Sequence, residues 1–299
     1  MSKKNFIVTS DSCADLFKSD YEKMQVPLIV VKRVLNGEEH SDVYDSEAEL
    51  DTFYESLKTE RPSTVAVNTQ EFVEFFTKVL SETEGDIIHI CLSSGLSLTY
   101  DNAIKALPEL EKIAKGRKIH IIDSLLATYG EAILVEALVE MRDAGFSTED
   151  ALAKAIHLRD HTQGWVVVSD LYHLKRGGRI SGAKAAIGTI LGIKPVICAS
   201  KYGKLAIENK AKGTKKAVSY LMEKLEELGD MANPDFLDSS MYILRTTKTD
   251  TYDELKKEIQ SKYPSVTLKE GIIGPVIGTH VGGEAVAIIF VGAPKLDIQ

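Results

Sequence analysis

The amino-acid sequence predicts an α/β protein of two domains, each with a largely parallel sheet covered by helices. The first observation is length, because 299 residues exceed what one hydrophobic core usually supports. The second is the alternation of short β-branched runs with helical patterns, which is typical of parallel sheets covered on both faces. The third is composition: 44% hydrophobic and 27% charged residues can bury such cores and argue against long disordered regions.

In the first half, strand and helix patterns follow one another along the chain. Four short apolar runs, each followed by polar or turn residues, predict strands at 5–8, 27–34, 86–92 and 118–122. Four segments with apolar residues at three- and four-residue intervals predict helices at 47–58, 69–81, 100–114 and 127–145.

A capped helix start, Ser147-Thr148-Glu149-Asp150, opens the last helix of this half, which is expected to run to about residue 161. We therefore predict an N-terminal domain of 1–162 and a C-terminal domain of 163–299. In the second domain the same patterns predict strands at 164–169, 194–199, 241–245 and 285–291, and helices at 215–228 and 252–263.

Charge and the N-terminal residues exclude several classes of protein. Lys and Arg number 36 against 44 Asp and Glu, a net charge of −8, whereas a nucleic-acid-binding protein normally has a basic surplus. The first eight residues lead directly into Thr9-Ser10-Asp11-Ser12, which leaves no room for the apolar region of a signal peptide. No stretch approaches the ~18 apolar residues that span a bilayer. We expect a cytoplasmic protein that neither binds nucleic acid nor inserts stably into membranes.

Neither a metal nor an organic cofactor is predicted. Cys13, Cys91 and Cys198 are widely spaced and lie in apolar or strand-like segments of the sequence, so we expect buried structural thiols. The sequence has no Walker A loop, no GxGxxG after a strand, no GxSxG elbow and no HExxH. Six histidines lack metal-ligand spacing with acidic or thiol partners and are assigned no role: His40, His89, His120, His157, His161 and His173.

Hydroxyl side chains gather where the predicted strands end, which is where parallel α/β sheets bind ligands. Four places carry them: 10–12, 93–99, 123–124, and the loop at Ser63-Thr64. Each could simply cap a helix, a contribution of about 1 kcal/mol. Four hydroxyls around Gly95, including Ser94 and Ser97, exceed what one cap requires and can bind an anion.

Two segments of the second half could also contact an acidic group. Residues 173–181 combine two glycines with Lys175, Arg176 and Arg179, so the backbone can approach an anion while guanidinium groups donate to it. A helix end followed by a surface loop is the other interpretation. His280 lies among glycines before the last predicted strand, where a tight turn could fix its ring.

Together these segments resemble the DegV family of bacterial fatty-acid-binding proteins, which includes the lipid-carrying subunit of fatty acid kinase. The resemblance spans nearly the whole chain. The matching segments occur in the family's order: Thr9-Ser10-Asp11-Ser12, Ser93-Ser94-Gly95-Leu96-Ser97-Leu98-Thr99-Tyr100, Asp123-Ser124, Lys175-Arg176-Gly177-Gly178-Arg179-Ile180-Ser181, Ile193-Lys194-Pro195 and Ile277-Gly278-Thr279-His280.

The resemblance implies two α/β domains that clamp one long-chain fatty acid, such as palmitate, between them. Thr64 and Ser97 would hold its carboxylate, with Ser63 and Ser94 beside them. His280 and Arg179 would lie near the head group and serve phosphate transfer by a separate ATP-binding kinase subunit. The chain itself would be a binding protein rather than an enzyme.

The sequence departs from the family pattern at four places, so the preferred acyl chain stays open. These are Val65-Ala66-Val67-Asn68 for the usual S-Q-P-S, Leu98 and Ala132 at usual glycines, and Lys212 at a usual arginine. Lys212 keeps the charge of an arginine but not its bidentate geometry.

Two other functions stay open at this point. One is a serine-dependent esterase or acyltransferase, with Ser94 or Ser97 as nucleophile and His280 as base. The other is a phosphate or nucleotide binder built on residues 175–179.

Overall fold

The computed structural model describes residues 4–169, 171–180, 192–229 and 241–298. The first sheet is parallel throughout, as predicted. Its strands, in spatial order, are β2 (Leu28–Ile29), β1 (Phe6–Asp11), β6 (Asp86–Cys91) and β7 (Ile119–Asp123).

Helices cover both faces of this sheet, which explains why every residue of β1 is buried. One face packs against α3 (Thr69–Glu82) and α4 (Thr99–Leu110). The other face packs against α5 (Tyr129–Asp143) and α6 (Thr148–His161). The predicted helix start is confirmed, because the Ser147 side chain accepts the N–H of Asp150.

The second sheet is mostly antiparallel, so the expected largely parallel sheet is wrong for this half. Its strands in spatial order are β10 (Leu205–Lys212), β9 (Ile193–Ala199), β8 (Thr162–Val167), β13 (Val286–Val291), β11 (Met241–Arg245) and β12 (Leu268–Ile272). Only the β11–β12 pair is parallel. Residues 200–204 alone connect β9 to β10, and a parallel pair needs a much longer crossover.

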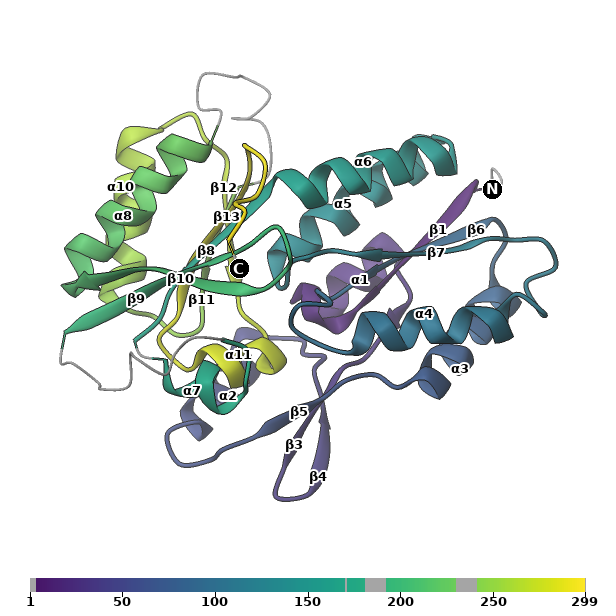
Figure 1. The fold of residues 1–299 in the computed structure, drawn as a ribbon, viewed down its shortest axis with the longest axis horizontal. Helices are drawn as coiled ribbons and strands as arrows, with labels where there is room; N and C mark the ends of the chain where they lie inside the picture. Colours follow the sequence, from purple (N-terminus) through teal and green to yellow (C-terminus); the bar gives the residue numbers. More distant parts are fainter. Residues whose placement is uncertain (1–3, 170, 181–191, 230–240, 299) are drawn as a thin grey trace.

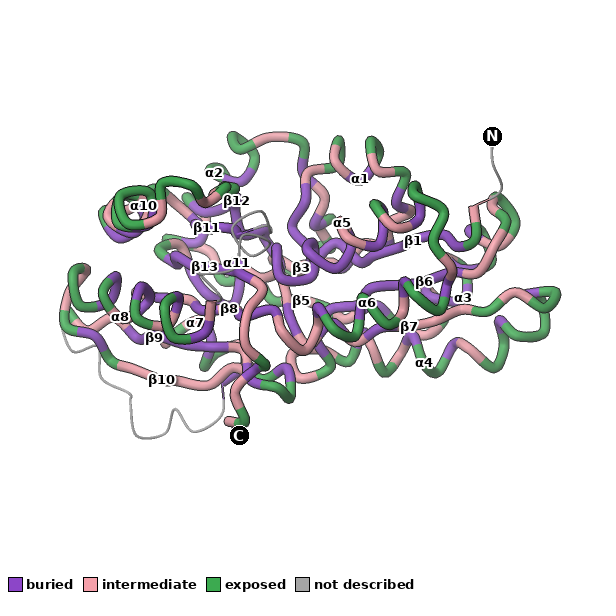
Figure 2. The backbone as a smooth tube through the Cα atoms, turned by 90° about the horizontal axis from the view of Figure 1, so that it is seen from above, coloured by how far each residue is buried: buried purple, intermediate pink, exposed green. Residues whose placement is uncertain are grey.

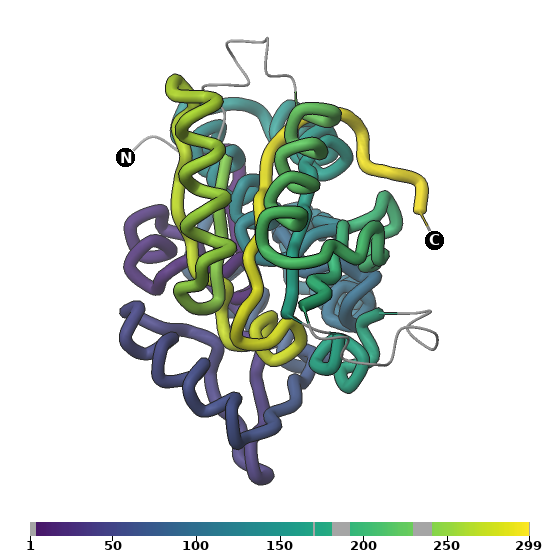
Figure 3. Tube along the Cα trace, turned by 90° about the vertical axis from the view of Figure 1, so that its left-hand side faces the viewer, coloured from purple at the N-terminus to yellow at the C-terminus, as the bar shows by residue number. Residues whose placement is uncertain are grey.

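The outer face of the second sheet is covered by α8 (Gly213–Leu228) and α10 (Asp250–Lys262), which lie side by side in front of its strands (Figures 1 and 3). Strands β1, β8, β11 and β13 are largely buried, whereas exposed residues lie along α8 and α10 (Figure 2).

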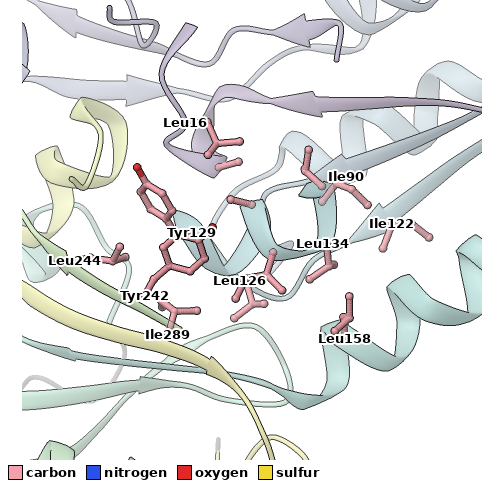
Figure 4. Packing of buried hydrophobic residues seen from close by; sticks show 14 of the residues in the cluster. Leu16, Ile90, Ile122, Leu126, Tyr129, Leu134, Leu158, Tyr242, Leu244 and Ile289 are labelled. Atoms are coloured by element: carbon pink, nitrogen blue, oxygen red, sulfur yellow. The ribbon is translucent and has the colours of Figure 1, made fainter. Parts of the chain in front are cut away.

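Helix α5 lies between the two sheets, and residues 129–135 are all buried. Leu134 belongs to one hydrophobic cluster with Ile90 of β6 and with Leu244 and Ile289 of the second sheet (Figure 4). Because these residues of α5 are buried all round, the helix packs against both sheets. The α/β architecture with two main sheets is therefore confirmed, while the division between residues 162 and 163 stays a prediction.

A third, antiparallel sheet comprises β4 (Glu38–Ser41), β3 (Lys32–Leu35) and β5 (Ser63–Val65). The single strand expected at 27–34 is thus divided between β2 and β3, which belong to different sheets. The remaining helices are η1 (Ser12–Ala14), α1 (Lys18–Met24), α2 (Glu47–Ser56), α7 (Tyr172–Arg176) and α11 (Pro275–Val281). No helix in the described parts of the chain combines the length and the apolar character needed to cross a membrane.

Four carboxyl groups of the described residues are buried: Asp11, Asp15, Asp42 and Glu131. Burial raises the pKa of each of them. Asp11 accepts the N–H groups of Cys13 and Leu92, but Glu131 accepts only the hydroxyl of Ser10, at 3.2 Å. Ionising a poorly solvated carboxyl costs free energy, so the protonated form of Glu131 is favoured in the folded state.

We predict that Glu131→Gln makes the free energy of unfolding less dependent on pH. A carboxyl group whose pKa is raised in the folded state stabilises the protein at pH values below its unfolded-state pKa. That stability is lost as pH rises through its folded-state pKa. The wild type should therefore lose stability as pH rises above the ordinary glutamate pKa of about 4.3, and the variant should lose less, as measured by urea unfolding. Glu140→Gln, at an exposed position of the same helix, is the matched control. Parallel pH profiles for the wild type and Glu131→Gln would contradict the interpretation.

Candidate functional site

A narrow pocket lies between the carboxyl end of the first sheet, the third sheet and the second half of the chain. Four predicted residues line it, namely Thr64, Ser97, Arg179 and His280. The rest of the lining is apolar: Val31, Val65, Ala66, Leu92, Leu96, Leu174, Leu205, Val276, Ile277 and Val281. Its volume is about 50 Å³, which is small beside the roughly 300–1,000 Å³ of ordinary small-molecule pockets.

Thr64 lies in strand β5 and not in the loop expected from the sequence. Its strand pairs with β3, where Thr64 is opposite Arg33. Thr64 Oγ1 is 2.9 Å from His280 Nε2, so the two predicted residues are in hydrogen-bond contact across the pocket.

His280 lies in the last turn of α11, so the tight turn expected around its ring is wrong. The helix begins at Pro275, a residue favoured at this position because its missing N–H is not needed there, and it ends before Gly282, whose φ is +84°. The ring is 9% exposed, and Nδ1 has no hydrogen-bond partner among the described residues. Burial first, and then the positive charges of Arg179 and Arg176, lower the pKa of His280 to about 3. Its imidazole is therefore neutral at physiological pH.

The glycine- and arginine-containing segment after α7 packs against this histidine. A Cβ on Gly177 would lie 2.1 Å from His280 Nδ1, so only glycine lets the backbone come this close. Arg176 donates to the carbonyl of Pro62, immediately before β5, at 2.9 Å. Arg179 donates to the carbonyls of Leu96, at 3.1 Å, and Gly177. Both guanidinium groups thus bind backbone, and Ser181 lies outside the described residues.

Ser97 belongs to the loop between β6 and α4. Its Oγ lies 2.9 Å from Thr99 Oγ1 and accepts the N–H of Thr99, at the start of α4. The loop is fixed from behind, because Ser93 donates to the carbonyl of Gly203 at 2.7 Å and its N–H donates to the carbonyl of Leu126. Ser97 therefore both accepts a backbone N–H at the start of α4 and lines the pocket.

Ser63 and Ser94 do not line the pocket, and both are exposed. Hydroxyls at the other strand ends bind within the protein. Ser10 donates to Glu131, Ser12 donates to Asp42, and Ser124 donates to the carbonyl of Leu126. Most of the hydroxyls predicted to gather at the sheet edge therefore bind other groups of the protein. Two of them, Thr64 and Ser97, line the pocket.

Two residues that the sequence analysis did not single out hold α11 in place. Asp42 accepts the N–H of Val276 at 2.8 Å, in the first turn of the helix. Tyr54 of α2 donates to the carbonyl of Ile273 at 2.5 Å. The sequence carried one signal for this helix, the Gly274-Pro275 pair, because proline is common at the first helical position.

One group of three side chains brings possible metal-ligating atoms within 4.8 Å of one another among the described residues. It comprises Asp11, His89 and Cys91, all fully buried. Both Asp11 oxygens already accept backbone N–H groups, and His89 Nδ1 lies 2.9 Å from Thr9 Oγ1. Burial raises the pKa of the Cys91 thiol, which disfavours the thiolate that a metal needs. We interpret these residues as part of the core. The prediction of three buried thiols is confirmed.

The esterase hypothesis requires a serine hydrogen-bonded to a histidine base. Instead, His280 Nε2 lies against Thr64, the Ser97 hydroxyl lies against Thr99, and Ser94 is exposed. The described geometry does not pair either serine with the histidine.

Comparisons with known proteins agree with this fold. The sequence model of the DegV family, described as "Uncharacterised protein, DegV family", matches residues 5–293. The chain belongs to the DegV family. A DegV domain-containing protein of Clostridium perfringens is 32% identical over 98% of this chain and 99% of its own length.

Two solved DegV structures have the same fold. DegV of Bacillus subtilis, described as a fatty acid binding protein, is 28% identical and has a TM-score of 0.79, covering 97% of this chain and 100% of that one. A fatty acid binding DegV family protein of Streptococcus agalactiae has a TM-score of 0.83 at 23% identity, covering 97% of this chain and 99% of that one.

In this DegV protein we predict that Gly177→Ala displaces the ring of His280. The added methyl would overlap Nδ1, and such overpacking typically costs about 1–3 kcal/mol. Urea unfolding should reveal the loss of stability, and NMR of the imidazole should reveal a changed environment for His280. Gly283→Ala is the control, because a Cβ there meets nothing within 4 Å. An unchanged His280 signal in Gly177→Ala would contradict the predicted contact.

Proposed function

We propose that this protein binds a long-chain fatty acid, such as palmitate, between the halves of the chain and presents its carboxylate to the ATP-binding subunit of a fatty acid kinase. The observation that carries the proposal is the pocket itself, where four polar residues from distant parts of the sequence meet an otherwise apolar lining. The relative from Bacillus subtilis, described as a fatty acid binding protein, supports the ligand class. The kinase partner follows from the family resemblance.

The four polar residues supply what a fatty-acid carboxylate requires. Arg179 is the only cation among the described residues that line the pocket. It has five N–H donors, of which Nε and one on Nη1 are directed at backbone carbonyls. Thr64 and Ser97 add hydroxyl donors, and neutral His280 lies beside Thr64 without adding charge to the pocket. Ser63 and Ser94 are exposed, and we assign them no ligand contact.

The acyl chain provides most of the affinity in this proposal. Burial of about fourteen methylenes, at roughly 0.8 kcal/mol each, gives about 11 kcal/mol before the costs of association. A hydrogen bond to the carboxylate contributes on the order of 1.5–3 kcal/mol. The pocket lies between two hydrophobic clusters, because Leu174 and Val281 belong to one and Leu92 and Val276 to the other. A volume of about 50 Å³ means that these side chains must move apart to admit the chain.

Native mass spectrometry of the protein purified from bacteria tests whether it carries a fatty acid. We expect a fraction of molecules heavier by the mass of one fatty acid, which solvent extraction removes and added palmitate restores. A protein that carries no such species and takes up none from palmitate would refute the proposal.

Thr64→Ala and Ser97→Ala should each weaken retention of palmitate. Loss of one hydrogen bond to an ionised carboxylate corresponds to about a ten- to hundredfold weaker affinity. Competition with a fluorescent fatty acid measures the change. Ser94→Ala is the matched control, since this serine belongs to the same loop but is exposed. Equal affinities in all these proteins would contradict the head-group assignment.

His280→Ala is expected to retain palmitate but to be a poor substrate for the kinase. Thr64, Ser97 and Arg179 still contact the carboxylate in this variant, whereas the phosphate acceptor loses the group placed beside it. Acyl-phosphate formation with the purified kinase subunit and ATP measures the effect, and palmitate affinity is the internal control. A variant phosphorylated at the wild-type rate would remove His280 from this role.

A further inference from the structure

His157 and His161 lie one turn apart on α6, remote in sequence from every residue of the pocket. Their ring centroids are 4.2 Å apart and the ring planes are inclined by 26°, so the imidazoles stack. His157 is exposed and His161 is half-buried. Helices use this i, i+4 spacing of histidines to bind zinc, since both side chains then lie on one face.

A backbone contact fixes the tautomer of one ring. His161 Nδ1 lies 2.8 Å from the carbonyl oxygen of His157. A carbonyl oxygen can only accept, so Nδ1 carries the hydrogen and donates it. Nε2 of His161 then presents a lone pair. Metal-binding histidines are typically held in this way, with one ring nitrogen bonded to a backbone oxygen and the other free for the ion.

The position on the helix also favours a bound cation. The pair spans the last two turns of α6, at the end where the helix dipole is negative. Asp160, the acidic neighbour in this turn, pairs with Arg159 at 2.8 Å and leaves the histidines as the donors.

We propose that His157 and His161 form a two-histidine site for a first-row transition-metal ion of the Zn²⁺, Ni²⁺ or Cu²⁺ type, with water completing the coordination. Imidazole ligands suit these ions and not Mg²⁺ or Ca²⁺. The ion would bridge the last turn of α6, immediately before β8. There the His161 carbonyl accepts the N–H of Gly292, at 2.8 Å, so the site lies where the two halves of the chain join. This inference does not depend on the fatty-acid proposal.

Isothermal titration of the full chain with Ni²⁺, after removal of any affinity tag and treatment with EDTA, tests the site. We expect one Ni²⁺ per chain, no binding of Mg²⁺, and affinities weaker by at least about tenfold in His157→Ala and in His161→Ala. His40→Ala, which changes a histidine outside this pair, should bind like the wild type. Circular dichroism checks that the exposed substitutions leave the fold intact.

A second variant tests the spacing itself. Ala153 is exposed and lies one turn before His157, so Ala153→His in the His161→Ala background recreates an i, i+4 pair on the same helix. Recovery of Ni²⁺ binding supports chelation by paired imidazoles. Binding that stays at the level of His161→Ala contradicts it. Wild-type affinity in both single variants, with loss in Cys91→Ser instead, would overturn the proposal in favour of the buried group at Asp11, His89 and Cys91.

Discussion

The contact between Thr64 and His280 is the constraint on which the rest of the site depends. The two residues are 216 positions apart in sequence, and their side-chain atoms are 2.9 Å apart. One belongs to a short strand of the small third sheet and the other to a helix of the second half. A hydrogen bond of this length requires both elements to be held to within a few tenths of an ångström. The surrounding structure supplies that precision from both sides.

Helix α11 is held by the first half of the chain as much as by its own half. Asp42 binds the N–H of Val276, and Tyr54 binds the carbonyl of Ile273. On the opposite side Arg176 binds the carbonyl before β5, and Gly177 leaves the space that the His280 ring fills. The strand and the helix that meet at the pocket are thus each tied to the other half of the chain.

This arrangement accounts for one carboxyl of the buried acidic group. Burial raises the pKa of Asp42, which opposes ionisation, while the N–H of Val276 and the charge of Arg33 favour it. A buried carboxyl is costly unless it has such partners. The hydrogen bond of Asp42 to Val276 offsets part of this cost and fixes the helix that carries His280 into the pocket. Asp15 lies against the residue that precedes the same helix: burial and the charge of Asp42 raise its pKa, while a hydrogen bond from the backbone of Gly274 opposes that rise.

The pattern of apolar residues predicted the first sheet and its covering helices because β1 and β6 are almost entirely buried, while α3 and α4 each bury one apolar face. The same reasoning failed for β10, an edge strand in which only three apolar residues, 205–207, precede the polar residues 208–210. It also failed for β5, which has three residues and is defined by pairing with β3 rather than by its own sequence. Edge strands depend on tertiary contacts, which cannot be predicted from the local sequence.

The candidate site was predicted residue by residue only where a side chain has distinctive chemistry. Thr64, Ser97, Arg179 and His280 are recognisable in the sequence, and the structure brings all four to one pocket. The apolar lining was not predicted, because the sequence does not distinguish a leucine in a pocket wall, such as Leu174 or Leu205, from a leucine in a hydrophobic core. Ser63 and Ser94 were expected beside Thr64 and Ser97, but they do not line the pocket. Adjacency in sequence to a pocket residue does not place a side chain on the same face of a strand or loop.

The two ends of the pocket differ in how freely they can move. At the polar end, Arg179 is bonded to the Leu96 carbonyl and the loop of Ser97 is bonded to Gly203 and Leu126, so directional contacts fix the donors. At the apolar end, residues such as Leu174 and Leu205 are held only by non-directional packing, which can rearrange through rotamer changes at modest cost. Under the proposed function, a fatty acid needs a fixed position for its carboxylate and an adjustable enclosure for its tail. The hydrogen-bonded end with Thr64 and Ser97 would provide the first, and the leucines and valines behind it would provide the second.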